Sequence, residues 1–190
     1  FTNDDTGLLE TTYGGYFHDD FTWFDKVKKT GEETLVNKID YKWTDKKYFS
    51  KKWEGYIRAK KGSYTFKLSS DDSSHLKIGD KIVINNGGFH PVREKTGIFN
   101  ITDEITELPV VIYYGQNDWR AEVKFEWMGG DQKELTTDLS KIFRPSKYVE
   151  PAKEEPKEAE KPKEEPKEDE EAEEDEEAEE DEEAEEDEEA

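Results

Sequence analysis

The chain has 190 residues, no cysteine and a formal net charge of -22, and 13% of its residues are aromatic. Without cysteine, neither a disulfide framework nor a thiolate metal site can form. No run of about 18 apolar residues is present, so the sequence predicts no membrane insertion.

The negative charge is concentrated at one end of the sequence. Residues 150–190 contain 26 acidic residues and 5 lysines, whereas residues 1–149 contain 24 acidic and 23 basic residues. Residues 1–149 have the usual size of one folded domain, which we expect to be monomeric. Because the charges of this part nearly cancel and its lysines occur in short runs, we predict that it binds no nucleic acid.

The first third of the chain predicts short strands separated by polar segments. Residues 1–6 are polar and predict a loose lead-in, and strands are predicted over 7–13 and 39–43. Between these strands, residues 16–24 are rich in aromatic side chains without a clear period, which indicates a packed loop or a short strand. Residues 26–38 are polar and are expected to be exposed.

The central stretch contains the clearest strand signals. Residues 53–58 and 63–68 alternate between the two faces of a strand, and the segment 59–62 (AKKG) predicts a turn between them. Two strand-like runs, 76–78 (LKI) and 81–84 (KIVI), are separated by Gly-Asp, which predicts a hairpin with a two-residue turn.

The last part of the domain repeats this pattern. Residues 97–101 and 108–114 predict a short and a longer strand, and residues 121–127 alternate strictly between apolar and charged side chains. Residues 135–145 predict a short helix or an irregular segment. Many short strands with turn signals between them, and almost no helical periodicity, indicate an all-β sandwich or barrel.

From about Glu150 the composition changes. Blocks of Pro, Lys and Glu are followed by three repeats of EEDEEA over residues 173–190. Like charges three and four residues apart oppose a helix, and no apolar side chain larger than Ala or Pro occurs beyond Val149 to offset the cost of ordering. We predict a disordered, extended acidic tail over residues 150–190.

Asp71 and Asp72 are the first candidate for binding chemistry, because they lie between the predicted strand 63–68 and the predicted hairpin. Carboxylate oxygens suit a hard cation such as Ca²⁺. Neighbouring strand residues point to opposite faces, so the peptide between the two aspartates must be distorted if both are to bind one ion. The alternative is that the sequence Asp-Asp-Ser-Ser forms only a solvated turn.

The polar segment 115–119, GQNDW, is the second candidate. Gln116, Asn117 and Asp118 offer amide and carboxylate oxygens that could complete a Ca²⁺ shell. The ring of Trp119 could lie against the apolar face of a sugar. The alternative is a polar hairpin loop with Trp119 folded back into the core.

Other site patterns do not occur in the sequence. It has no EF-hand spacing, no phosphate-binding glycine loop with its lysine, and no zinc spacing among its three histidines. No nucleophile motif or convincing acid–base pair is recognisable, so we predict that the protein is not an enzyme.

Several short motifs occur together in the order typical of one family: Gly7–Leu9, Trp53–Ile57, Gly62–Phe66, Ser69–Ser73, Leu76–Asp80 and Phe125–Trp127. The sequence resembles the fourteen-kilodalton protective-antigen (PA14) domain family, shared by bacterial toxins, glycosidases and yeast flocculins and adhesins. The resemblance covers about Gly7 to Pro145 and implies an antiparallel β-sandwich. The sequence departs from the family in having Gly-Asp instead of Asp-Gly in the hairpin turn, and in lacking the cysteines that pin N-terminal loops in yeast adhesins.

In lectin members of this family, an Asp-Asp pair joined by a cis peptide binds Ca²⁺, and the ion coordinates vicinal sugar hydroxyls. The resemblance implies the following roles: a carboxylate pair at Asp71 and Asp72, an amide ligand at Asn117 or Gln116, main-chain ligands near Asp118 and Trp119, and sugar contact by Trp119. It implies a calcium-dependent carbohydrate-binding domain of an adhesin, extracellular or at the cell surface, with a glycan or glycoprotein partner. The alternative is a protein-interaction or structural module whose acidic tail binds Ca²⁺ weakly.

Overall fold

The computed structural model describes residues 1–152, and the predicted tail over 150–190 therefore lies almost wholly outside the described residues. Residues Phe1–Glu150 form one compact unit that is nearly all β, which confirms the predicted fold class. Within the described residues, no helix is long and apolar enough to cross a membrane.

All recorded strand pairs are antiparallel. The elements are β1 (Leu8–Gly14), the 3-10 helix η1 (Phe21–Asp25), β2 (Thr34–Val36), β3 (Asp40–Trp43), β4 (Phe49–Asp71), β5 (Ser73–Ile78), β6 (Lys81–Asn86), β7 (Arg93–Gln116), β8 (Ala121–Gly129), β9 (Gln132–Thr136) and β10 (Phe143–Arg144).

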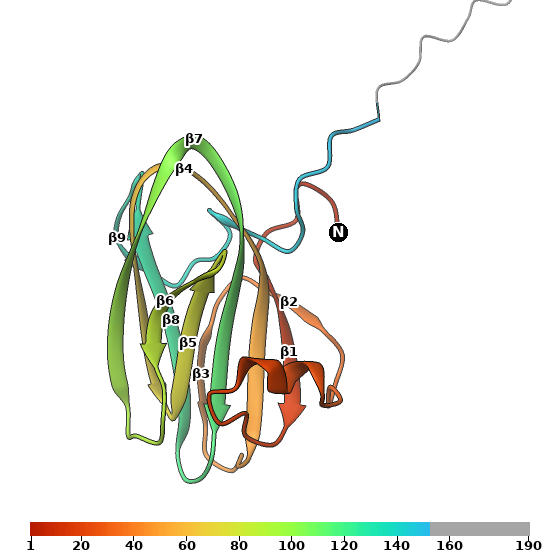
Figure 1. Cartoon of the computed structure of the whole chain (residues 1–190), viewed down its shortest axis with the longest axis vertical. Coiled ribbons are helices and arrows are strands. Elements are labelled where there is room, and N and C mark those ends of the chain that lie inside the picture. The colour runs from red at the N-terminus through yellow and green to blue at the C-terminus, as the bar shows by residue number, and fades with distance from the viewer. Residues whose placement is uncertain (153–190) are drawn as a thin grey trace, which may run out of the picture. The chain divides into compact units, whose positions relative to one another are not determined.

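Two long strands, β4 and β7, organise the sandwich. They pair from Phe49–Gln116 to Ser70–Arg93, with one register shift between Lys60 and Gly62. Both strands arch over at one end of the molecule, so their two halves lie in different layers (Figure 1). One layer continues through β1, β2, β5 and β6, and the other through β8, β3 and β9. A single sheet thus folds back on itself and forms an antiparallel β-sandwich, as the resemblance implies.

The predicted interruption of these strands is wrong. The segments 53–58 and 63–68 are one strand, β4, and the segments 97–101 and 108–114 are one strand, β7. Lys60 lies at the register shift between β4 and β7 and is exposed. The apolar alternation stops at the bend, where the pairing of β4 with β7 shifts register and resumes at Gly62.

Most other predicted elements are confirmed. The strands over 7–13, 39–43 and 121–127 correspond to β1, β3 and β8, and the hairpin corresponds to β5 and β6. Residues 16–24 form a packed loop that includes the start of η1, rather than a strand. Residues 26–38 are mostly exposed, but β2 pairs there with β1. Residues 135–145 are irregular around the end of β9 and the short β10, and contain no helix.

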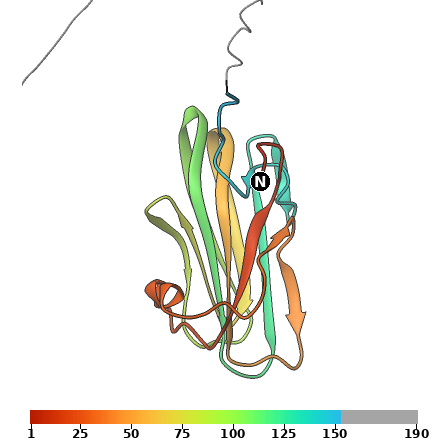
Figure 2. The same ribbon diagram turned by 90° about the vertical axis from the view of Figure 1, so that its right-hand side faces the viewer.

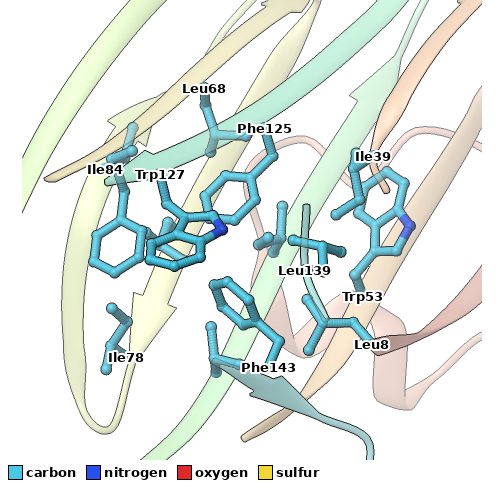
Figure 3. Packing of buried hydrophobic residues seen from close by; sticks show 14 of the residues in the cluster. Leu8, Ile39, Trp53, Leu68, Ile78, Ile84, Phe125, Trp127, Leu139 and Phe143 are labelled. Atoms are coloured by element: carbon cyan, nitrogen blue, oxygen red, sulfur yellow. The ribbon is translucent and has the colours of Figure 1, made fainter. Parts of the chain in front are cut away.

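The core lies between the layers and draws on both (Figure 3). Trp53 of β4 and Leu8 of β1 come from one layer, and Phe125 and Trp127 of β8 come from the other. Phe143 of β10 packs edge to face against both of these β8 rings. A second cluster forms where the aromatic loop packs on the outer side of β7; it contains Tyr13, Tyr16, Phe17, Phe24 and Tyr113.

Candidate cation and ligand site

The two aspartates lie where the chain crosses between the layers. Asp71 ends β4 opposite Glu122 of β8, and Ser73 begins β5 opposite Gly115 of β7. The peptide between Asp71 and Asp72 is cis, as the resemblance implies. Because β7 ends one residue after Gly115, this register brings the second predicted segment beside the aspartates. Figures 1 and 2 show the β3–β4, β6–β7 and β7–β8 connections at the same end of the sandwich.

Asp72 is held firmly in place. Its side chain is buried, with 6% of the residue exposed. Oδ1 accepts the main-chain N–H of His90 at 3.1 Å, and Oδ2 accepts the main-chain N–H of Asn117 at 3.0 Å. Its own N–H donates to Oε1 of Gln116 at 2.9 Å. A carboxylate oxygen has further lone pairs, so both oxygens can still accept from a ligand.

Asp71 is less constrained. Its carbonyl accepts the hydroxyl of Tyr114 at 2.6 Å, but its carboxylate accepts no N–H or O–H donor among the described residues. Burial, and then the adjacent charge of Asp72, raises the pKa of Asp71 to about 6. Burial also raises the pKa of Tyr114 above its ordinary value, so the hydroxyl stays protonated and donates.

The donor chemistry of the pair fits a hard cation. Within residues 1–152, neither aspartate forms a salt bridge with a lysine or arginine. Two adjacent carboxylates are both negative, and these two are partly removed from water. Each therefore opposes the ionisation of the other unless a positive group lies between them. No group of three or more His, Cys, Asp or Glu side chains suited to a metal is found in the described part. Further ligands here would be amide, main-chain or water oxygens, as Ca²⁺ accepts.

Gln116 ends β7 beside the pair and is completely buried, with 0% exposed. Oε1 accepts the N–H of Asp72 and faces the hydroxyl of Tyr114 at 3.1 Å. Nε2 donates to the carbonyls of Asp118 at 2.7 Å and Arg120 at 2.8 Å. Of the two amides predicted as ligands, Gln116 is the one whose carboxamide is fully occupied within the protein.

The β7–β8 loop presents its other predicted residues differently. The carboxylate of Asp118 pairs with Lys47 at 2.8 Å, which lowers the pKa of Asp118. The Asn117 carbonyl accepts the N–H of Tyr48 at 3.1 Å, while the Asn117 carboxamide makes no hydrogen bond to any residue that the structure describes. Trp119 is 82% exposed, so the alternative that it folds back into the core is wrong.

Two further exposed aromatics belong to this end of the molecule and are missed by the sequence reading. Tyr48 is 57% exposed, and its N–H is bonded to the loop at Asn117. Phe89 is 61% exposed and precedes His90, whose N–H binds Asp72. An aromatic placed directly after Gly-Gly, as Phe89 is, signals an exposed ring; Tyr48 has no such signal.

A cleft of about 620 Å³ lies elsewhere and contains none of the predicted site residues. It is lined by β4 residues at the bend, by the β8–β9 turn and by residues before β10, including Arg58, Lys60, Tyr64, Gly130 and Lys141. Its lining contains one carboxylate, that of Asp131, and no adjacent pair. The candidate site is therefore the carboxylate pair together with the loops around it.

Comparisons with known proteins agree with the fold. The chain superposes on a PA14 sugar-binding domain from an RTX adhesin with a TM-score of 0.62 at 16% identity, covering 74% of this chain and 99% of that one. For the Epithelial Adhesin 6 A domain from Candida glabrata, in complex with Galβ1-3GlcNAc, the TM-score is 0.61 at 13% identity, covering 76% and 89%. For an anti-sigma factor domain-containing protein, the TM-score is 0.62 at 19% identity, covering 75% of this chain and 49% of that one, so the chain spans about half its length.

No curated protein matches the sequence. The model of the family described as PA14 domain matches residues 4–141, which include every predicted site residue. The match extends over more than two thirds of the chain and agrees with the motifs found in the sequence and with the solved structures. The chain therefore belongs to the PA14 domain family.

Proposed function

We propose that this protein is a calcium-dependent carbohydrate-binding domain of an extracellular or cell-surface adhesin. The observation that carries the proposal is the pair of adjacent carboxylates at Asp71 and Asp72, which forms no salt bridge with a lysine or arginine among the described residues and is held beside a loop with an exposed tryptophan. Two structural neighbours support it, because one is named as a sugar-binding domain from an adhesin and another is an adhesin domain in complex with a disaccharide.

The residues that would hold the ion follow from the contacts described above. Asp71 and Asp72 supply the carboxylates, and Asn117 supplies the amide oxygen. In the loop, the carbonyls of Asn117, Asp118 and Arg120 all accept hydrogen bonds, whereas that of Trp119 accepts none from the described residues. We assign the main-chain ligand to Trp119 and leave Gln116 and the Asp118 carboxylate out of the shell.

A bound Ca²⁺ would supply positive charge to which vicinal hydroxyls of a sugar can bind directly. The chain itself supplies the apolar contact, because the Trp119 ring is exposed next to Asn117. Tyr48 and Phe89 carry further exposed rings on the two neighbouring connections. Binding, and not chemical conversion, is the role of these side chains in our proposal, and the partner is a glycan or glycoprotein.

The first experiment detects the ion at the folded part of the full chain. Tb³⁺ takes the oxygen ligands of Ca²⁺ and emits when a nearby tryptophan is excited. Residues 150–190 contain no aromatic residue, so ions bound by these acidic residues give no sensitised emission. We expect sensitised emission that Ca²⁺ displaces, and we expect Asp72→Asn to abolish it, whereas Asp80→Asn, on the exposed hairpin turn, leaves it unchanged.

The second experiment is a glycan array probed with and without a calcium chelator. Binding that appears only with Ca²⁺ and disappears in Asp72→Asn supports the proposal, and binding that survives the chelator contradicts it. Deleting residues 151–190 tests the alternative of a tail-driven interaction module. If the folded domain binds the glycan, the truncated chain keeps the array pattern. If the acidic residues are responsible for binding, the truncated chain loses it.

A further inference from the structure

We propose that Gln116 is a positioning residue that sets the distance between the carboxylate pair and the β7–β8 loop, and thereby the size of cation that the site selects. This inference rests on the proposed function, but it concerns a residue that would not touch the ion or the sugar. Gln116 is fully buried at the end of β7, and both ends of its carboxamide bond the segments that would hold the ion.

The carboxamide of Gln116 is committed to contacts inside the protein. Its oxygen accepts the N–H of Asp72, and its nitrogen donates both protons, to the carbonyls of Asp118 and Arg120. The hydroxyl of Tyr114 lies 3.1 Å from the oxygen and has its shorter contact, 2.6 Å, with the carbonyl of Asp71. Turning the amide over would set its nitrogen against the N–H of Asp72 and its oxygen against two carbonyls, so this orientation is fixed. Because Gln116 is completely buried in these contacts, we assign it no place among the ligands of the ion.

The contacts of Gln116 join two segments that are far apart in the sequence. On one side it bonds the main chain of Asp72, whose carboxylate also accepts the N–H of Asn117. On the other side it draws in the carbonyls that flank Trp119 in the sequence. Asn117 and Trp119 are therefore held at a distance from Asp72 that depends on the length of one glutamine side chain.

This arrangement also accounts for the one loop carbonyl that is left without a hydrogen bond. Trp119 has a φ of 71°, in the left-handed region that non-glycine residues seldom adopt. The carbonyls on either side of it both turn to Nε2 of Gln116, so its own carbonyl is the one of the three that makes no hydrogen bond to the described residues. Loosening Gln116 would widen the choice of separations open to the ligands, and a wider site discriminates less well between cations of different radius.

The test uses the full chain and compares three variants. Gln116→Met keeps the length of the side chain and removes the hydrogen bonds of the carboxamide, and Gln116→Glu keeps the acceptor and removes the two donors. Gln132→Met, in β9, is the matched control, because it makes the same change away from the site. Each is titrated with Tb³⁺ by sensitised emission and then with Ca²⁺ and Sr²⁺ as competitors, and each is melted in chelator.

We expect both Gln116 variants to bind Ca²⁺ at least about tenfold more weakly, with a ratio of Ca²⁺ to Sr²⁺ affinity that moves towards one. Gln132→Met should match the wild type in both quantities. A general loss of stability lowers the melting temperature but does not change the ratio between two ions, so the ratio separates positioning from folding.

Every result decides the inference. If the wild type gives no sensitised emission that Ca²⁺ displaces, the proposed function fails whatever the variants do. If the wild type binds and the Gln116 variants retain its affinity and its Ca²⁺ to Sr²⁺ ratio, only the positioning role is overturned. If both Gln116 variants are unfolded in chelator and in Ca²⁺, Gln116 is a determinant of the fold, and the positioning role is likewise overturned.

Discussion

Oδ2 of Asp72 accepts the main-chain N–H of Asn117 at 3.0 Å, although the two residues are 45 positions apart in the sequence. One carboxylate oxygen of Asp72 thus holds the loop that carries the proposed co-ligand, Asn117. Asp71 makes no such bond through its carboxylate and has the raised pKa. The two neighbouring aspartates therefore differ in role: Asp72 builds the site and can bind, whereas Asp71 carries a charge that the protein alone does not compensate.

This difference predicts that Asp71→Asn stabilises the calcium-free protein at neutral pH. The folded-state pKa of Asp71 is about 6 and the ordinary value is 3.8. Because the folded state holds the proton more tightly, the free energy of unfolding falls as the pH rises from about 4 to about 6, and the full penalty applies above that range. After discounting for the partial exposure of the carboxylate, we expect a gain of about 1 kcal/mol at pH 7.

Urea denaturation in chelator at pH 7 and near pH 3 measures this effect. The variant should exceed the wild type at pH 7 and equal it near pH 3, where Asp71 is protonated in both states. Adding Ca²⁺ should reverse the order at pH 7, because only the wild type retains both carboxylates. If the variant is less stable than the wild type in chelator at pH 7, other groups of the protein already compensate the negative charge of Asp71.

The fold was predictable where one face of a strand is buried and was mispredicted where the sheet bends. The alternation in β8 is complete, and Val123 and Phe125 are both buried as the pattern predicts. At the bend of β4, the lysines interrupt the alternation, and the sequence indicates a turn. What continues there is pairing with β7, and backbone hydrogen bonds leave no trace in the side-chain pattern.

The residue types of the candidate site are visible in the sequence, but the different contacts that each residue makes are not. Adjacent aspartates and a polar loop with a tryptophan are visible in the sequence, but Gln116 and Asn117 are chemically alike. Only the register of β5 against β7 places the Gln116 carboxamide next to the Asp72 N–H, whereas the Asn117 carboxamide makes no hydrogen bond to the described residues. The hydrogen bond that Tyr114 donates to Asp71 cannot be predicted from the sequence either, because the position of Tyr114 in an apolar run indicates a core residue.

The exposed aromatics predict a separation of ion binding from sugar binding. Trp119→Ala should lower the affinity for the best glycan on the array by about tenfold, roughly 1.4 kcal/mol, because an aromatic face is lost. Tyr48→Ala should have a smaller effect on the same glycan. Calorimetric titration of the full chain with that glycan in saturating Ca²⁺ measures both.

The control for these variants is Phe1→Ala, which removes an exposed aromatic at the N-terminus. It should bind Ca²⁺ and glycan as the wild type does. The Ca²⁺ affinity of Trp119→Ala should also stay unchanged, since the proposed ligand at this position is a main-chain oxygen. Loss of Ca²⁺ affinity together with sugar affinity would show that the ring shapes the loop instead of contacting the sugar.

A buried polar network beneath β1 predicts a second dependence on pH. Glu10 accepts Nζ of Lys51 at 2.7 Å, the hydroxyl of Tyr41 at 2.6 Å and Nε1 of Trp53 at 2.8 Å. Burial opposes the charge on Glu10, but these donors outweigh it, and the pKa of Glu10 is lowered from 4.5. A lowered carboxyl pKa stabilises the fold above the unfolded value and loses that contribution as the pH falls through the folded value.

Glu10→Gln should therefore cost about 2–3 kcal/mol at pH 7, because Lys51 is left buried without its counter-charge. The difference from the wild type should shrink below about pH 4, as Glu10 itself becomes protonated. Denaturation curves at pH 7 and below pH 4 measure this difference in the free energy of unfolding. If the difference does not depend on pH, the substitution disturbs the packing of the network and not its charge. Ca²⁺ affinity in the folded variant should be unaffected.

The packing of β10 against β4 predicts a steric effect at Gly55. A Cβ at this position would overlap the carbonyl oxygen of Arg144 and lie 2.7 Å from Cδ2 of Leu8. Gly55→Ala must therefore displace β10, which carries the buried Phe143, and we expect a loss of about 2–3 kcal/mol. Gly31→Ala is the matched control, because nothing lies within 4 Å of its Cβ, and it should change stability by less than about 0.5 kcal/mol. Equal melting temperatures for the two variants would mean that β10 yields without cost and that Phe143 contributes little to the core.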